Sequence, residues 1–487
     1  MPPYECALSV VDQIMPTMNT TMWLVFKAED PDTALKAIKK GLDRTVVQLP
    51  FLSGDVFVDT KDQSKSKIRW ADDDPKVLFE EVTTSNGPTY EEFEKQGFDL
   101  HKFPANVYSP GLLDSMASDV KPVLIMSFIK IRGGLIILFA PHHAIVNGGG
   151  RELLIKLWSS NTTGVVDPIH KIDPKEPLDR SERLTQIVRN ATTDCGESGV
   201  TEKPLLSPPG TEAPASTQPS ETPPTTAKLF EFSVRRLEAL RRALRRKTKE
   251  DFSLNTMVTS LIWVTWTSNY ILKQRAANSD FKATQRYSEL IMTINARSVL
   301  AKGSFLEKDS WLGNLASAIL PPPQLSFDDA SDDFFELEIG DPEQRLLCRK
   351  SIPAVIEMIT SGLASTTASI VAGMWANLLE SAKNPAFDWT TARANLAVDS
   401  GRNLVHTNWG SLDLLQDFGP GVGRPKAARV MGVGAPPGIC VTLPRHRSKE
   451  CGEELLDRYD VCFCLQADEL EVFEQDGLMK AISRNEV

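Results

Sequence analysis

The pattern of hydrophobic and polar positions predicts helices and strands in both halves of the chain. In the first half, apolar residues recur at helical spacing over Pro31–Asp43, and two apolar runs, Val123–Ile131 and Leu135–Ala140, flank a hairpin signature of Arg-Gly-Gly. The second run leads directly into a histidine pair, and helical spacing resumes over Arg151–Ser159. The histidines are therefore predicted at a strand end, where ligands are usually met in α/β sheets.

The second half also mixes helices and strands. Val234–Lys247 predicts an amphipathic helix with arginines on its outer face, and Leu254–Gln274 predicts a buried helix because apolar residues cover most of its circumference. The remaining elements expected here are strands at Glu289–Ile294, Ile439–Leu443 and Asp460–Gln466, and helices at Ala364–Ala382 and from Asp468 onward.

A segment rich in Pro, Ser, Thr, Glu and Gly separates the two halves. It runs from about Gly196 to Thr226, and its composition cannot bury a core. We predict an N-terminal domain over residues 1–195, an exposed linker over 196–227 and a C-terminal domain over 228–487. Two domains also fit the length of 487 residues, which is more than one hydrophobic core usually serves.

Charge and composition exclude several classes of protein. A formal net charge of −10 argues against a nucleic-acid binder. The seven cysteines are odd in number and contain no C-x-x-C pair, so they are interpreted as reduced thiols rather than disulfides or metal ligands. The opening residues do not resemble a signal peptide, and charged residues interrupt the longest apolar run. We expect a soluble cytoplasmic protein with no bound metal, no membrane and no nucleic-acid partner.

The sequence PHHAIVNGGG, residues 141–150, contains the residues best suited to chemistry. A histidine fixed at a strand end can accept a proton from a substrate hydroxyl, and its ordinary pKa near 6.5 suits this task. The glycines allow a tight turn and close approach of a ligand. Taken alone, such a histidine is more often structural than catalytic, so the interpretation depends on a second motif.

These residues resemble the H-x-x-x-D-G motif of the BAHD acyltransferases. His143 occupies the histidine place, Asn147 the aspartate place and Gly148 the glycine place, and His142 gives the doubled histidine known from condensation domains of peptide synthetases. Downstream, Thr407–Pro425 resembles the D-F-G-W-G element of the family, with proline in place of tryptophan at position 420. The matching residues are Asp417, Phe418, Gly419 and Gly421.

Shorter matches extend the resemblance over nearly the whole chain. The opening LSVVDQIMP and QLPFLSGDV are similar to the start of the fungal, trichothecene acetyltransferase-like members, and INARSVL with WLGN is similar to an arginine-bearing strand and a Gly-Asn turn of the family. The resemblance implies an α/β fold of two chloramphenicol-acetyltransferase-like domains, each a mixed sheet flanked by helices, with a channel between them. It also implies a monomer.

The resemblance implies that His143 is a general base in this channel. Acyl-CoA, expected to be acetyl-CoA, would be the co-substrate, the acceptor would be the hydroxyl of a small secondary metabolite, and no covalent enzyme intermediate would form. The loop at Asp417 would shape the cofactor side. Three arginines of the predicted second-half helix are candidate contacts for the CoA phosphates, although a charge run on an amphipathic helix is usually its solvated face. They are Arg235, Arg242 and Arg246.

Asn147 departs from the family pattern. In the family the motif aspartate pairs with an arginine, here matched by Arg297, which holds the histidine turn in shape. Asn147 cannot form this ion pair, but its amide oxygen can accept a hydrogen bond from the guanidinium. Three hypotheses remain: acyl transfer to an external hydroxyl, intramolecular cyclisation driven by His143 without acyl-CoA, and a catalytically silent binding protein. The nearly intact motif speaks against the third hypothesis.

Overall fold

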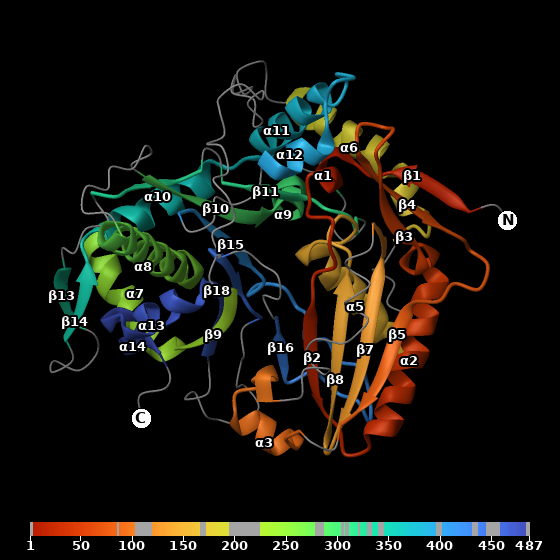
Figure 1. The fold of residues 1–487 in the computed structure, drawn as a ribbon, viewed down its shortest axis with the longest axis horizontal. Helices are drawn as coiled ribbons and strands as arrows, with labels where there is room; N and C mark the ends of the chain where they lie inside the picture. Colours follow the sequence, from red (N-terminus) through yellow and green to blue (C-terminus); the bar gives the residue numbers. More distant parts are fainter. Residues whose placement is uncertain are drawn as a thin grey trace.

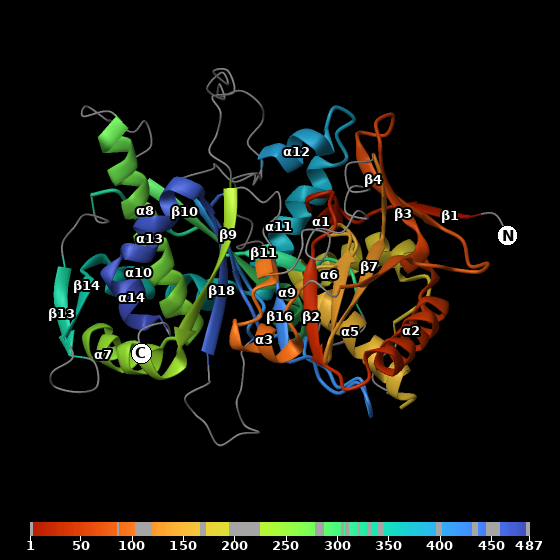
Figure 2. The same cartoon turned by 60° about the horizontal axis from the view of Figure 1, so that its bottom comes forward.

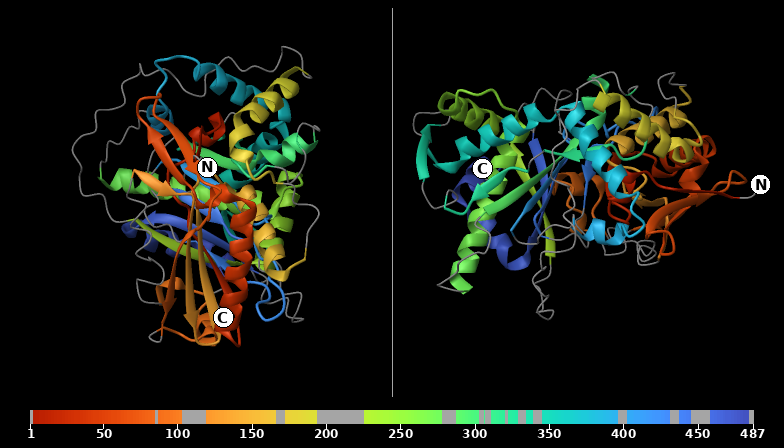
Figure 3. Two further views of the ribbon diagram at one scale, coloured as in Figure 1. Left: turned by 90° about the vertical axis from the view of Figure 1, so that its right-hand side faces the viewer. Right: turned by 90° about the horizontal axis from the view of Figure 1, so that it is seen from above.

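Two lobes lie side by side in the structure, a computed structural model (Figure 1). The view from above in Figure 3 separates the same two lobes. The residues that the structure describes are 3–84, 87–102, 119–165, 172–193, 225–277, 287–302, 306, 311–319, 322–328, 334–338, 345–395, 402–430, 437–444 and 458–483. Most of the predicted linker lies outside these ranges, so the domain boundaries stay predictions.

The first lobe is built on a mixed sheet, in the order β16-β2-β8-β7-β5. Strand β5 runs parallel to β7, and the other neighbours are antiparallel. A smaller antiparallel sheet has the order β1-β4-β3-β6. The strands are β1 (Tyr4–Ala7), β2 (Met22–Lys27), β3 (Asp55–Asp59), β4 (Lys65–Trp70), β5 (Leu78–Thr83), β6 (Val120–Pro122), β7 (Leu124–Ile131), β8 (Gly134–Pro141) and β16 (Ala427–Arg429).

Helices α2 and α5 pack together on one face of the mixed sheet. The predicted hairpin is confirmed, since β7 and β8 pair from Ile131 and Gly134 onward. Gly133 turns the chain there with a φ of +78°, a conformation that favours glycine. The helices of this lobe are α1 (Val10–Gln13), α2 (Pro31–Gln48), α3 (Tyr90–Lys95), α5 (Gly148–Thr163) and α6 (Glu176–Thr193), with short 3-10 helices at Pro50–Ser53 and Leu100–Lys102.

The second lobe also contains a mixed sheet flanked by helices. Its strands follow the order β11-β10-β15-β17-β18-β9, and β12 pairs with β10. They are β9 (Thr225–Ser233), β10 (Tyr287–Asn295), β11 (Ala316–Ala318), β12 (Gln324–Ser326), β15 (Leu404–Asn408), β17 (Ile439–Thr442) and β18 (Arg458–Gln466), and a separate hairpin joins β13 (Phe334–Glu338) to β14 (Arg345–Arg349). The helices are α7 (Val234–Thr248), α8 (Leu254–Ala277), α9 (Ala296–Lys302), α10 (Ser351–Ser365), α11 (Ala368–Ser381), α12 (Trp389–Asn395), α13 (Ala467–Gln475) and α14 (Gly477–Ile482).

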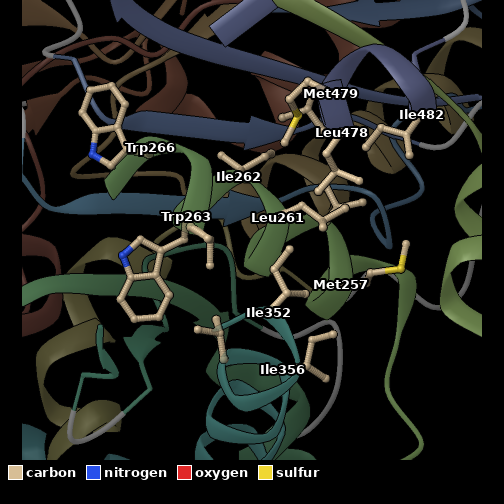
Figure 4. Packing of buried hydrophobic residues seen from close by; sticks show 14 of the residues in the cluster. Met257, Leu261, Ile262, Trp263, Trp266, Ile352, Ile356, Leu478, Met479 and Ile482 are labelled. Atoms are coloured by element: carbon tan, nitrogen blue, oxygen red, sulfur yellow. The ribbon is translucent and has the colours of Figure 1, made fainter. Parts of the chain in front are cut away.

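Helix α8 forms the centre of the second core, as its continuous apolar circumference predicts. Figure 4 shows Met257, Leu261 and Ile262 of this helix among side chains of α10 and α14. The indole of Trp263 is fully buried, and its Nε1 atom donates a hydrogen bond to Ser288 Oγ at 2.9 Å. This hydrogen bond satisfies the one polar group of the buried indole and connects α8 to β10.

The helix predicted over Ala364–Ala382 is confirmed as α11, but it begins at Ala368, because α10 ends at Ser365 and a break follows. Thr366 and Thr367 lie at the break. The Thr366 hydroxyl donates to the carbonyl of Gly362, while Thr367 accepts a hydrogen bond from the amide of Ile370 and caps α11. Threonine hydroxyls compete with helical backbone hydrogen bonds in this way.

No single helix in the described ranges is both long and apolar enough to cross a membrane. Only α10 and α11 taken together reach that length and composition, and these two helices are bent by 77° at the break between them.

Elements from each half of the sequence pack against elements from the other half. Strand β16, from the second half of the sequence, pairs with β2 of the first lobe and stands between the lobes in Figures 1 and 2. Phe418 and Val422 from the preceding loop belong to the first core. In return, α6 of the first half packs against α11. Residues of the second half therefore complete the first core, and residues of both halves form a separate apolar cluster between α6 and α11.

Candidate active site

The PHHAIVNGGG sequence forms a tight turn between β8 and α5. Asn147 is the N-cap of α5, because its Oδ1 atom accepts a hydrogen bond from the amide of Gly150 at 3.0 Å. A Cβ atom at Gly150 would lie 1.9 Å from the carbonyl oxygen of Leu312. Because glycine has no Cβ atom, the backbone around Leu312, just before β11, can approach the histidine turn closely.

Two hydrogen bonds to its main-chain groups hold His143 at the end of β8. Its amide donates to the carbonyl of Met18 at 2.8 Å, and its own carbonyl accepts a hydrogen bond from Asn314 Nδ2 at 2.9 Å. The Nδ1 atom is buried and has no hydrogen-bond partner among the described residues. Burial is the largest influence on the pKa of His143 and lowers it, and the positive charge of Arg151 acts in the same direction. Its own carbonyl and Asp12 act in the opposite direction, but the pKa remains lowered. The ring is thus held as the free base.

His142 points into the protein and is fully buried. Its Nδ1 atom accepts a hydrogen bond from the amide of Ala144 at 3.2 Å, which helps to form the turn. Burial lowers the pKa of His142 to about 3, with a smaller contribution from His143. Among the described residues, no three His, Cys, Asp or Glu side chains are grouped as metal ligands.

The hydrogen bond predicted between Asn147 and Arg297 is present. Nη1 of Arg297 donates to Oδ1 of Asn147 at 2.9 Å, the same oxygen that caps α5. The guanidinium also donates to the carbonyls of Trp311, Leu312 and Gly313. Arg297 was expected on a strand, but it lies in the first turn of α9, because β10 ends at Asn295. The amide therefore takes over the geometric role expected of the missing carboxylate.

A buried polar network behind the turn escaped the sequence analysis. Oδ1 of Asp12 accepts hydrogen bonds from the amide and Nδ2 of Asn314, at 2.9 and 2.7 Å. Arg180 contacts Asp12 at 3.1 Å and forms an ion pair with Glu176. Asn314 thus connects this network to the His143 carbonyl. Ser9-x-x-Asp12 is a recognisable capping signal, but its partners lie more than 160 residues away in the sequence.

The Asp417–Gly421 loop packs along α5 rather than only within the second half. Phe418 is buried between Phe26 and Trp158, with ring centroids at 5.4 and 5.1 Å. Asp417 accepts a hydrogen bond from the amide of Gly419, and Gly419 and Gly421 have φ angles of +89° and +80°. The glycines are therefore required by the backbone, whereas Pro420 is exposed and leaves room for other residues.

The three candidate CoA-binding arginines lie on the exposed face of α7. This helix packs against α8, α10, α14 and β9, and it lies apart from α5 in Figures 1 and 2. The structure does not bring Arg235, Arg242 and Arg246 to the histidine turn.

Comparison with known proteins defines the class of the fold. F. graminearum TRI101, solved with coenzyme A and deoxynivalenol, superposes with a TM-score of 0.70 at 17% identity over 99% of both chains. Vinorine synthase superposes with a TM-score of 0.59 at 15% identity, over 98% of this chain and 94% of its own. The protein therefore has the two-domain BAHD fold, with chloramphenicol-acetyltransferase-like mixed sheets flanked by helices, as predicted.

Within this class, residues 18–161 match the trichothecene 3-O-acetyltransferase-like N-terminal domain. Trichothecene 8-O-acetyltransferase of Fusarium sporotrichioides is 32% identical over 203 residues, which are 38% of this chain and 41% of that protein. The match spans about two fifths of the length of this relative. Communesin N16 acyltransferase of Penicillium expansum is 21% identical over 97% of this chain and 96% of its own length. The resemblance to the fungal, trichothecene acetyltransferase-like branch is thus confirmed.

Proposed function

We propose that the protein transfers an acyl group, acetyl in the first place, from acyl-CoA to a hydroxyl of a fungal secondary metabolite. The observation that carries this proposal is the way His143 is held. Backbone hydrogen bonds fix it on both sides, the Asn147–Arg297 hydrogen bond fixes its turn, and burial keeps its ring unprotonated. A fixed, unprotonated histidine at a strand end is suited to general-base catalysis.

The Nε2 atom of His143 is the proposed base, because Nδ1 is buried. It takes the proton of the acceptor hydroxyl while that oxygen attacks the thioester carbonyl. The tetrahedral intermediate collapses, the C–S bond breaks, and the CoA thiolate receives the proton from the imidazolium. The ester and free CoA leave, and histidine returns to its neutral state. No bond forms between the enzyme and the acyl group in this scheme.

The cofactor side is proposed at the loop that packs along α5. Leu412 and Trp409 lie closely against Gly148, and Phe418 contacts Trp158 further along the same helix. The TRI101 structures from two Fusarium species were solved with coenzyme A bound. The arginines of α7 would contribute only if the bound cofactor reached the second lobe. A monomer in the cytoplasm remains the expected state.

The test is acetyl-CoA consumption with and without a panel of secondary-metabolite alcohols. Alcohol-dependent thiol release is expected, and replacing His143 by Ala or Gln should lower turnover about 10²–10⁴-fold while leaving the melting temperature unchanged. Calorimetry on the His143→Gln variant should still detect saturable binding of CoA. Unchanged turnover would exclude His143 as the base. Conversion of a substrate without any CoA would instead favour intramolecular cyclisation.

Because burial lowers the pKa of His143, its active, unprotonated form should persist to more acidic pH than that of an ordinary histidine. The acidic limb of kcat/KM against pH is therefore expected below about 6.5. A limb well above this value would contradict the buried environment of the ring.

A further inference from the structure

A buried guanidinium to which the described part of the chain offers no counter-charge lies next to the histidine turn. Arg151, in the first turn of α5, is 1% exposed. Its Nη2 atom donates to the carbonyl oxygen of Thr20 at 3.1 Å and to the Thr20 hydroxyl. Its Nε and Nη1 atoms are buried and have no hydrogen-bond partner among the described residues. Such groups are rare in folded proteins and require an explanation.

The contacts of Arg151 place it beside His143. The amide of Thr20 donates to the carbonyl of Pro141, and Met18 accepts the amide of His143, so residues 18–20 run alongside the histidine turn. The guanidinium also lies over the ring of Trp409, 4.8 Å from its centroid. Arg151 is therefore enclosed by the histidine turn on one side and by the proposed cofactor-side segment on the other.

The buried charges around this turn do not balance. Arg180 faces two carboxylates, Asp12 and Glu176, which leaves one negative charge. Arg297, whose hydrogen bonds go to neutral oxygen atoms, offsets that charge. Arg151 is left as an additional cation, and within the described residues no carboxylate pairs with it. Asn147 contributes to this imbalance, because the family aspartate would supply one more negative charge here.

An unpaired buried cation is unfavourable in the resting protein. Burial lowers the pKa of Arg151 to about 9, which reflects the cost of keeping the charge away from water. This cost is recovered when a negative charge appears next to the guanidinium. Acyl transfer produces one such charge, on the carbonyl oxygen of the tetrahedral intermediate. A positive charge that is already in place before the oxyanion forms needs no reorganisation during the reaction.

We propose that Arg151 stabilises the oxyanion of the transfer reaction through the uncompensated positive charge of its guanidinium. This inference rests on the proposed function and adds to it the residue that supports the developing negative charge. Arg151 would then serve catalysis at the expense of stability, since a side chain of similar volume without charge would be easier to bury.

The test compares catalysis and stability in Arg151→Met, Arg151→Lys and a control, Arg69→Met. Arg69 also lies over an aromatic ring, that of Phe57 at 5.2 Å, but on β4, outside the site. Arg151→Met is expected to lower kcat about 10²–10³-fold. Its KM for acetyl-CoA should stay nearly unchanged and its melting temperature should be equal or higher.

Arg151→Lys should recover part of kcat, because it retains the charge without the planar fork. Arg69→Met should keep full activity. Unchanged kcat in Arg151→Met, a loss confined to KM, or an equal fall of kcat and melting temperature in both Arg151 variants would each overturn the inference while leaving the proposed function in place. A wild-type protein that transfers no acyl group to any alcohol would overturn both.

Discussion

One amide oxygen at position 147 connects three parts of the site. Oδ1 of Asn147 caps α5 through Gly150 and accepts the guanidinium of Arg297, so the helix, the histidine turn and the segment after β10 are fixed together. Burial lowers the pKa of Arg297 to about 10, and the positive charge of Arg180 adds to this effect, whereas Glu176, Asp12 and Glu152 act in the opposite direction. A neutral acceptor preserves the geometry, but it leaves the guanidinium without a direct ion-pair partner among the described residues.

This arrangement predicts the effect of restoring the family residue. Asn147→Asp should keep the cap and add a charge-assisted hydrogen bond to Arg297, so the melting temperature is expected to rise. Acyl transfer should stay equal or increase. Asn147→Ala is the matched comparison, because it removes both hydrogen bonds and should lower stability by at least about 1 kcal/mol. The measurement is the melting temperature of both variants. A loss of soluble protein in Asn147→Asp would contradict the contact between position 147 and Arg297.

The residues of the site differ in how well the sequence predicts them. His143, Asn147 and Gly148 lie within the ten residues 141–150, so a local motif identifies them and the structure places them in one turn. The contact with Arg297 required the resemblance, because the two residues are 150 positions apart. Arg151 has no local signal of its own: an arginine in the first turn of a helix usually faces solvent, and only tertiary packing shows that it is buried and unpaired.

At the scale of elements, the pattern of apolar residues predicts well those helices and strands that pack directly on a core. Helices α2, α5, α7 and α8 and the β7–β8 hairpin appear where expected, with ends shifted by a few residues. The helix predicted over Ala364–Ala382 begins only at Ala368, after the break at Thr366 and Thr367. Hydroxyl hydrogen bonds there separate α11 from α10, and hydrophobic periodicity does not report them.

The loop at Phe418 gives a prediction at this scale. Its ring fills a site between Phe26 and Trp158 in the first core, so Phe418→Ala should destabilise the protein by about 3–5 kcal/mol. Pro420→Trp, at an exposed position of the same loop, should change stability by less than about 0.5 kcal/mol. Urea unfolding of the two variants provides the measurement. Equal effects at both positions would show that the loop does not depend on the aromatic contact.

At the scale of the whole molecule, ionic contacts between the lobes accompany the exchanged segments. Arg429 of β16 forms an ion pair with Asp460 of β18 at 3.2 Å, and its Nη2 atom donates to the carbonyl of Gly97 at 2.6 Å. Arg458 contacts both Asp460 and Glu231. These groups are largely buried, so the interface depends on all of its members being present.

The exchange predicts that the two halves stay together without a covalent connection. A specific protease site introduced into residues 196–227 should yield two fragments on a denaturing gel but a single, unchanged peak in size-exclusion chromatography. The physical reason is that β16 completes the first sheet while α6 packs on α11. Acyl transfer should survive the cleavage. Separate elution of the fragments would show that the exchanged segments contribute too little to hold the lobes together.

Strand β16 also has a consequence for the newly made chain. About 400 residues separate Lys27 at the end of β2 from Ala427 at the start of β16. At synthesis rates of about 5–20 residues per second, the edge of β2 waits about 20–80 s for its neighbour. During that time the ribosome-bound chain presents an open strand edge and an unfilled place for Phe418. The first lobe is thus the first to be made but is completed only near the end of synthesis, and it is exposed to aggregation while still attached to the ribosome.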